Sequence, residues 1–239
     1  MSKVDLRLDW CSYEAAKYAV EHWHYSKKMP KARLVKIGVW EDGQFIGAVV
    51  FGGGANADLG APYGLTQFET AELVRVALKE HKNTVSKIVS YSIKMIKKEF
   101  SKLRLLVSFA DPEHNHAGGI YQAMNWIYIG MTEPADEYIF NGERRHGRGL
   151  RMTLASYNLQ GKNTLERAKQ LDPNAKTLKG SSKYRYLFPL DDAMRKQIEP
   201  LRKPYPKRES GEIDNAVQSN AQTGGASPTD SLYIEATNG

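Results

Sequence analysis

The sequence is poor in several features that would place it in a specialised class of protein. Its one cysteine, Cys11, excludes an internal disulfide and is typical of a protein in the reducing cytoplasm. No apolar stretch approaches the roughly 20 residues that a membrane-spanning helix needs. The first ten residues contain charged side chains, unlike a secretory signal peptide. We therefore expect a globular cytoplasmic protein without a membrane partner.

The balance of charge changes near the C-terminus. The chain has 34 Lys and Arg against 27 Asp and Glu, a net charge of +7. Residues 209–239 contain five acidic residues and no Lys or Arg, so residues 1–208 carry 34 minus 22, or +12. A domain this basic favours a nucleic acid as its partner, although a solvated basic face without a partner has the same composition. The polar tail at 209–239 is expected to be disordered.

Apolar periodicity and turn residues predict a mixed α/β fold. Alternating segments on either side of Asp42-Gly43 and of Asn141-Gly142 indicate hairpins, and Ser12 can cap the first helix. The predicted helices cover residues 12–23, 84–100, 120–125, 164–171 and 191–198, and the predicted strands cover 35–41, 45–52, 72–78, 103–109, 126–131 and 184–190. This order matches an α/β (α+β) architecture with a largely antiparallel central sheet, flanking helices and a long loop at 52–68.

The stretch at 103–131 is predicted to hold the active site. Its first apolar run suits a strand buried on both faces, and the run ends before Asp111-Pro112, where proline stops further pairing. A short helix and a second strand follow, so the polar turn lies at the carboxyl end of the first strand. Open α/β sheets usually place their ligands there, which indicates the active-site half of a transferase.

Two resemblances to known families are carried by this stretch and by the segments before it. The spacing of Tyr121 and Trp126 in YQAMNW resembles the Tyr-x-x-x-Gly-Phe segment of GNAT-type N-acyltransferases. Residues 23–148 are closer still to the Mom DNA-modification proteins of Mu-like phages. The segments that carry this second resemblance are HWHYSKKMP, GVWEDGQFIGAVVFGGGA, APYGL, ELVRVAL and SFADPEHNHAGGIYQAMNW.

These resemblances imply a fold and a division of the chain. In a GNAT-like sheet two central strands, here 72–78 and 103–109, part to receive the donor. Residues 1–156 are then the catalytic domain, 157–208 are a basic C-terminal extension packed on it, and 209–239 are the tail.

The Mom resemblance implies a DNA-modifying transferase. It would convert adenine in phage DNA to N6-carbamoylmethyladenine in the host cytoplasm and so protect the DNA from restriction endonucleases. The exocyclic amine of adenine is a poor nucleophile, because its lone pair is delocalised into the ring. The reaction therefore needs an activated donor, a proton acceptor and stabilisation of charge. The adenine must also leave the duplex, as in base flipping.

Five residues are candidates for the chemistry. Asp111 is predicted to accept the amine proton or to orient the amine, with an Asx-turn or helix cap as the alternative. Tyr121 aligns with the tyrosine that protonates the leaving thiolate in many GNAT enzymes, although a core tyrosine fits the same position. His114 and His116 can act as a base or bind phosphate. Glu72 is a further candidate in the predicted central strand.

Other residues are candidates for binding the substrate or the donor. Glu72 and Arg75 are three positions apart on one strand, so they are expected on opposite faces, and a structural ion pair is the alternative role. Aromatic residues near the long loop can stack on a flipped adenine or pack beneath that loop. The binding candidates are His24, Tyr25, Ser26, Tyr63, Phe68, Arg75 and Ser108.

Basic residues gather in patches that are expected to contact phosphates. The first patch is Lys27, Lys28, Lys31 and Arg33, and the second is Arg144, Arg145, Arg148 and Arg151. A third set is Lys183, Arg185, Arg202, Lys203, Lys207 and Arg208. A metal site is not expected. His22 and His24 form one of two His-x-His pairs, but residues two apart diverge on a helix and His22 is predicted to be helical.

The sequence leaves two candidates for the molecule that donates the transferred group. The GNAT resemblance implies acetyl-coenzyme A, whose pyrophosphate is bound in that family by a glycine-rich link after the central strand. Here the link at 79–87 reads KEHKNTVSK and has no glycine. A carbamoylmethyl group contains the same atoms as a glycyl residue, so glycyl-tRNA is the alternative donor, and tRNA a further partner.

Two other functions fit the sequence less well. An ordinary GNAT acetyltransferase acting on a small amine or protein would bind coenzyme A tightly and DNA weakly. A non-catalytic nucleic-acid-binding protein would keep its function when Asp111 or Tyr121 is substituted and lose it when Arg144 and Arg145 are reversed in charge.

Overall fold

The computed structural model describes residues 4–30, 33–53, 57–114 and 116–206. The disordered tail expected at 209–239 and the phosphate contacts expected of Lys31, Lys207 and Arg208 lie outside the described residues. None of the helices in the described ranges combines the length and apolar character needed to traverse a lipid bilayer.

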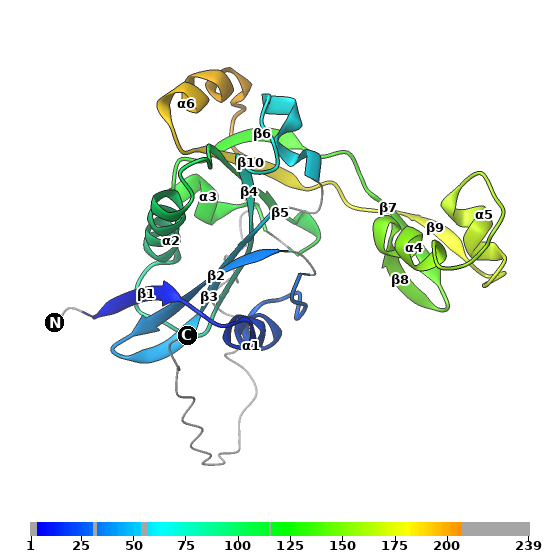
Figure 1. Ribbon diagram of the computed structural model, residues 1–239, viewed down its shortest axis with the longest axis horizontal. Helices are drawn as coiled ribbons and strands as arrows, with labels where there is room; N and C mark the ends of the chain where they lie inside the picture. The colour runs from blue at the N-terminus through cyan, green and yellow to red at the C-terminus, as the bar shows by residue number, and fades with distance from the viewer. Residues whose placement is uncertain (1–3, 31–32, 54–56, 115, 207–239) are drawn as a thin grey trace, which may run out of the picture.

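A seven-stranded sheet forms the body of the molecule (Figure 1). Its strands lie in the order β1-β2-β3-β4-β5-β10-β6, and every neighbouring pair is antiparallel except β4 and β5. The strands are β1 (Leu6–Trp10), β2 (Leu34–Glu41), β3 (Gln44–Gly52), β4 (Thr70–Leu78), β5 (Leu105–Ala110), β6 (Ile127–Met131) and β10 (Tyr184–Pro189). The predicted mixed, largely antiparallel sheet is confirmed; β1 was not predicted.

Helices cover both faces of this sheet because its strands alternate their side chains between two apolar cores. On β3, Val49 packs in the core beneath α2, whereas Ala48 packs beneath α1. The helices of the body are α1 (Tyr13–Trp23), α2 (Val85–Glu99), α3 (Gly119–Ala123) and α6 (Asp192–Ile198), with the 3-10 segments η1 (Ala57–Tyr63), η2 (Pro112–His114) and η3 (Glu199–Leu201). The predicted cap is present, since the Ser12 hydroxyl accepts a hydrogen bond from the Ala15 amide at 3.1 Å.

The two central strands part after a short paired segment. β4 and β5 pair only from Thr70 to Glu72 on one strand and from Leu105 to Val107 on the other. Beyond these residues β4 continues along β3, and β5 continues along β10. The parting that the GNAT resemblance implied for 72–78 and 103–109 is therefore confirmed.

A small second sheet projects from the body. It contains β7 (Asp136–Phe140), β8 (Glu143–His146) and β9 (Lys176–Lys179) in the order β8-β7-β9. With α4 (Gly147–Leu154) and α5 (Thr164–Lys169) it encloses a separate apolar cluster (Figure 1). We call residues 136–179 the arm.

The expected extension at 157–208 is not one unit. Its first part, with α5 and β9, completes the arm, and its second part returns to the body. There β10 lies between β5 and β6 and is antiparallel to both. Tyr186 and Leu187 of β10 are fully buried, so this strand belongs to the core rather than to an appendage.

Candidate active site

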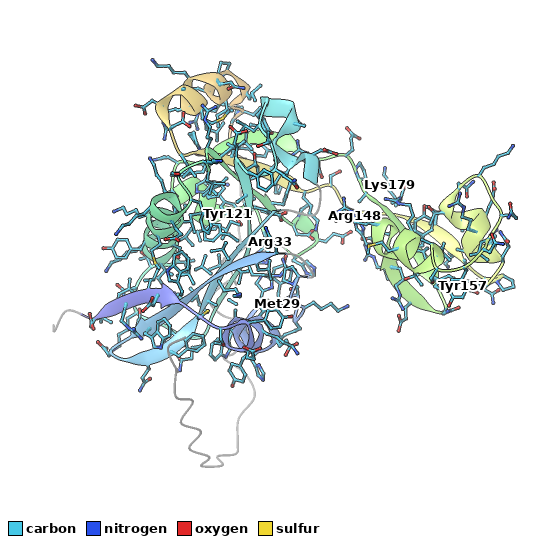
Figure 2. The ribbon with its side chains drawn as sticks, in the orientation of Figure 1. Met29, Arg33, Tyr121, Arg148, Tyr157 and Lys179 are labelled. Carbon is cyan, nitrogen blue, oxygen red and sulfur yellow. The ribbon has the colours of Figure 1, made fainter. Side chains whose placement is uncertain are left out.

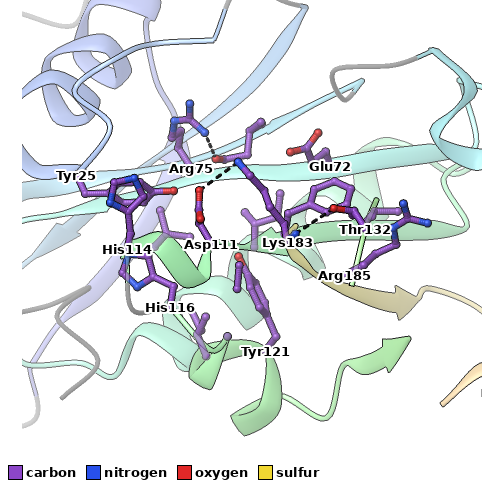
Figure 3. Close-up of a pocket in the computed structure, with 18 of the residues that line it drawn as sticks. Tyr25, Glu72, Arg75, Asp111, His114, His116, Tyr121, Thr132, Lys183 and Arg185 are labelled. Carbon is purple, nitrogen blue, oxygen red and sulfur yellow. Dashed lines mark hydrogen bonds and ion pairs between the residues drawn. The ribbon is translucent and has the colours of Figure 1, made fainter. Parts of the chain in front are cut away.

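A pocket of about 910 Å³ occupies the opening between β4 and β5 (Figure 3). Its walls come from both strands, the segment after α1, η1, η2, α3 and the two links to the arm. Of the residues predicted from the sequence to form the site, the pocket is lined by His24, Tyr25, Tyr63, Glu72, Arg75, Asp111, His114, His116 and Tyr121.

Asp111 is held at the wall of the pocket by an Asx-turn and an ion pair. One carboxylate oxygen accepts a hydrogen bond from the Glu113 amide at 3.1 Å, which is the Asx-turn. The other lies 3.3 Å from the ammonium group of Lys183 (Figure 3). The side chain is buried at the wall of the pocket. A carboxylate fixed in this way can accept a hydrogen bond from an amine that enters the pocket.

A chain of hydroxyl groups lies where β4 and β5 part. The Ser108 hydroxyl is 2.8 Å from the Leu73 carbonyl oxygen and 2.7 Å from the Tyr121 hydroxyl. Because the serine has one proton and donates it to the carbonyl, Tyr121 donates to Ser108. Burial raises the pKa of Tyr121 to about 12. The phenol is therefore protonated at neutral pH and suits a proton donor rather than a base. Ser108 lies behind Tyr121 and positions it.

Aromatic and imidazole rings gather on one side of the pocket. The ring of Tyr25 lies 4.3 Å from that of His24, 4.7 Å from His114 and 5.0 Å from His116. Tyr25 is half exposed. A planar group entering the pocket can stack against this cluster.

His24 is held as a neutral imidazole. Its Nδ1 accepts a hydrogen bond from the Ser26 amide at 3.1 Å and contacts the Ser26 hydroxyl at 2.9 Å. Burial, with a smaller contribution from the charge of Arg75, lowers the pKa of His24 to about 3. Ser26, a predicted binding residue, is not among the pocket-lining residues; it orients His24 instead.

Glu72 and Arg75 line the same pocket, so the prediction that they face opposite ways is wrong. Val50 of β3 pairs with Arg75, but the next residue, Phe51, pairs with Leu73. The extra residue, Val74, forms a β-bulge, which breaks the strict alternation of side chains. The Arg75 guanidinium donates to the carbonyl oxygens of Val74 at 2.6 Å and Lys28 at 3.5 Å.

Two basic residues that the sequence placed among surface phosphate contacts enter the pocket instead. Lys183 reaches Asp111, and Arg185 lies over the Phe109 ring with 5.7 Å between the guanidinium carbon and the ring centroid. Arg185 also donates to Tyr63, whose pKa burial raises. Both basic residues come from the start of β10. The sequence showed two cations at the predicted strand 184–190, but it did not indicate which strands this strand would pair with.

Phe68 does not line the pocket and is 69% exposed. It borders a second surface groove with Lys97, Lys102 and Arg104. η1 instead brings Tyr63 into a buried position in the wall of the pocket. The prediction that Phe68 stacks on the substrate in this pocket is therefore not supported by its position.

A model of the Mom protein family matches residues 5–207. The chain belongs to the Mom protein family. "Methylcarbamoylase mom" of Escherichia phage Mu is 26% identical over 212 residues, which cover 85% of this chain and 84% of that protein. At this identity the chain is a relative of the phage Mu protein, not the same protein.

Two solved structures are similar to this Mom family member. A putative acetyltransferase from Acinetobacter baylyi shares 13% identity over 86% of this chain and 99% of its own, with a TM-score of 0.43. Spermidine/spermine N-acetyltransferase SpeG from Vibrio cholerae shares 10% identity over 82% and 96%, with a TM-score of 0.41.

In this Mom family member the link before α2 does not fit a pyrophosphate well. The Glu41 carboxylate accepts hydrogen bonds from the amides of Lys82 at 2.8 Å and Asn83 at 2.7 Å. Although burial opposes it, these hydrogen bonds lower the pKa of Glu41. Two amides of the link are thus already bound to an internal anion.

The predicted basic patches differ in how free their side chains are. Arg144 forms ion pairs with Glu137 and with Glu113, and Arg145 pairs with Glu143 at 2.7 Å. Lys27 donates to the His22 carbonyl oxygen at 2.5 Å. Among the predicted phosphate contacts, the exposed side chains that form no ion pair in the described part of the chain are those of Lys27, Lys28, Arg33, Arg148, Arg151 and Lys203.

Within the described ranges, no group of three or more His, Cys, Asp or Glu side chains is arranged to hold a metal ion. His22 stacks on Tyr18 with 4.0 Å between ring centroids. The His114 and His116 rings are 6.5 Å apart.

Proposed function

We propose that this protein is a DNA-modifying transferase that adds a carbamoylmethyl group to the exocyclic amine of adenine. Membership of the Mom family and the similarity to the methylcarbamoylase Mom of phage Mu support this activity. The action is proposed to take place in the host cell, where the altered base would protect phage DNA from restriction endonucleases.

The observation that carries the proposal is the pocket between the parted strands, with Asp111 at its wall and Tyr121 beside it. The adenine nitrogen attacks the activated carbon of the donor, and the bond from that carbon to its leaving atom breaks. Asp111 takes a proton from the amine, and the Tyr121 hydroxyl gives its proton to the leaving atom. Arg75 supplies positive charge in the same pocket, which favours the charge that develops on the acyl oxygen.

The acceptor is proposed to be an adenine that has left the double helix. Tyr25, His114 and His116 offer ring faces on one side of the pocket, and such faces suit a purine. With a pKa of about 3, His24 adds no positive charge beside the base at neutral pH.

The donor is proposed to be glycyl-tRNA rather than acetyl-coenzyme A. A glycyl group has the atoms that the product requires, and a rearrangement after acylation would give the final linkage. The occupation of the Lys82 and Asn83 amides by Glu41 supports a donor without a pyrophosphate at that position. Purified protein, DNA and tRNA charged with labelled glycine should give labelled DNA. Labelling that survives ribonuclease treatment, or that requires coenzyme A, would contradict this donor.

Mass spectrometry of nucleosides tests the function itself. DNA from cells that express the chain should contain 2'-deoxyadenosine in which a carbamoylmethyl group replaces one hydrogen, and DNA from cells expressing Asp111→Asn should not. Unmodified DNA in the presence of soluble wild-type protein would contradict the proposal. Acetylated small amines or proteins would instead support an ordinary acetyltransferase.

A further inference from the structure

One face of α4 is exposed and has an unusual composition. Leu150 and Leu154 point into the apolar cluster of the arm, and Gly147 is buried at the start of the helix. Arg148, Arg151 and Met152, at positions i, i+3 and i+4, are exposed and form a stripe on the solvent side of the helix. Met152 is 72% exposed, more than any other large apolar side chain in the described part of the chain.

The arm as a whole is basic. Residues 136–179 contain nine Lys and Arg against five Asp and Glu, and α4 itself contains no acidic residue. Among the described residues neither Arg148 nor Arg151 forms an ion pair. This stripe therefore places two cations that form no ion pair in the described part of the chain beside one exposed apolar side chain. Such a surface complements the phosphates and the apolar base stack of a nucleic acid.

The stripe begins next to the pocket. His146, the N-cap of α4, lines the pocket, and its Nδ1 accepts a hydrogen bond from the Arg148 amide at 3.3 Å. Arg148 lies on the side of the arm nearest to the body, whereas Tyr157 lies at the far end of the arm (Figure 2). Met152 follows Arg148 by one helical turn, a rise of about 6 Å along the axis.

An ion pair links the arm to the turn that carries Asp111. Arg144 of β8 reaches Glu113 of η2 at 3.4 Å. The pair is exposed, so it contributes little to stability. It does show that the arm and the catalytic turn lie within side-chain reach of each other, as DNA held by one and modified at the other requires.

We propose that α4 enters a groove of double-stranded DNA and that Met152 inserts into the base stack where the target adenine leaves it. Arg148 and Arg151, which both precede Met152 along α4, contact phosphates on one side of the insertion. This inference rests on the proposed function, because only a base that must be extruded leaves a gap to fill. Proteins that distort DNA commonly insert an apolar side chain between base pairs. The flexible thioether of methionine fits irregular gaps.

The test uses the purified full chain and short duplexes that carry 2-aminopurine in place of a central adenine, with random flanking bases. The fluorescence of 2-aminopurine rises when the base leaves the stack. Wild-type protein should raise it, and Met152→Ala should lose most of this rise. The affinity of Met152→Ala should change by less than about threefold, because the phosphate contacts supply most of the binding energy. Met152→Leu should retain the rise.

Tyr157→Ala is the matched control. Tyr157 is 51% exposed on the same arm but far from the body, so its removal should leave the fluorescence unchanged. A full rise in fluorescence with Met152→Ala at saturating protein would contradict the insertion of Met152 into the base stack. So would a loss of tRNA binding by Met152→Ala with DNA behaviour unchanged. A fluorescence rise that depends on Met152, without any modified adenine in cells, would support the insertion of Met152 and contradict the proposed transferase activity.

Discussion

At the scale of single residues, Tyr121 and Ser108 form a hydrogen-bonded pair that ends on the Leu73 carbonyl of β4. The pair joins Tyr121, the proposed proton donor, to the backbone at the point where the strands part. A phenol with a pKa near 12 gives up its proton only to a strong base, such as a departing alkoxide or thiolate in the transition state.

Tyr121→Phe should therefore lower the extent of adenine modification by about 100-fold or more while DNA binding stays unchanged. Ser108→Ala should lower the extent of modification by less than Tyr121→Phe does, because Tyr121 keeps its proton and loses only a partner that orients it. Modified nucleosides quantified from DNA after equal expression measure both effects. Wild-type modification by Tyr121→Phe would remove this residue from the mechanism.

The imidazole of His24 predicts a pH dependence of stability. Its pKa is about 3 in the folded protein against 6.5 in the unfolded chain. Between these values the unfolded chain binds a proton that the folded protein does not, so stability falls as the pH falls below 6.5. His24 alone should lower the free energy of unfolding by about 2 kcal/mol between about pH 7 and about pH 5.

The measurement is thermal unfolding at these two pH values for wild type and His24→Gln. Glutamine can still accept the hydrogen bond from the Ser26 amide but does not titrate. The decrease in the free energy of unfolding from pH 7 to pH 5 should be smaller in His24→Gln, by about 2 kcal/mol. Equal drops in the two proteins would show that His24 is not held neutral by burial.

At the scale of elements, the β-bulge of β4 decides which side chains enter the site. It places Glu72 and Arg75 in one pocket, and the Arg75 guanidinium reaches the backbone of Lys28 in the segment after α1. That segment carries Tyr25, so one arginine connects the central strand to the proposed stacking surface.

Arg75→Met should loosen the segment at 24–30 because it removes the hydrogen bond to the Lys28 carbonyl oxygen. Hydrogen exchange of amides in this segment should become faster, with little change in β2 or α2. Arg75→Lys should not restore protection, since a single ammonium cannot donate in the two directions that the planar guanidinium spans. Unchanged exchange in Arg75→Met would show that the segment is held by other contacts.

At the scale of the whole molecule, the arm and the body together form the proposed DNA-binding surface. α2 also carries exposed lysines, but in Figure 1 it lies on the opposite side of the body from the arm. Substitutions on the arm and on α2 should therefore distinguish phosphate contacts made by the arm from an effect of the protein's overall positive charge.

The double variant Arg148→Ala with Arg151→Ala should reduce the salt dependence of DNA binding. Each lost phosphate contact lowers the slope of log affinity against log salt concentration by about 0.9. The expected decrease is thus about 2 for the double variant. Lys94→Ala with Lys98→Ala, on α2, removes the same charge and should leave the slope nearly unchanged. Equal decreases for both variants would mean that the arm has no specific role.

The sequence by itself determined the local structure and part of the site. Asp42-Gly43 and Asn141-Gly142 specify tight turns, and Ser12 caps its helix, because these conformations depend on a few adjacent residues. The buried strand before Asp111 marked the end of the sheet where the pocket lies. The apolar run alone is enough to predict that this strand is buried on both faces.

Only the tertiary structure decided which distant segments meet. β10 inserts between β5 and β6 and carries Lys183 and Arg185 into the pocket, and the bulge at Val74 turns Arg75 toward Glu72. Strand pairing joins residues far apart in the chain through backbone hydrogen bonds, which any sequence can form. Its register therefore leaves little trace in local composition, and it is settled by the packing of the whole core.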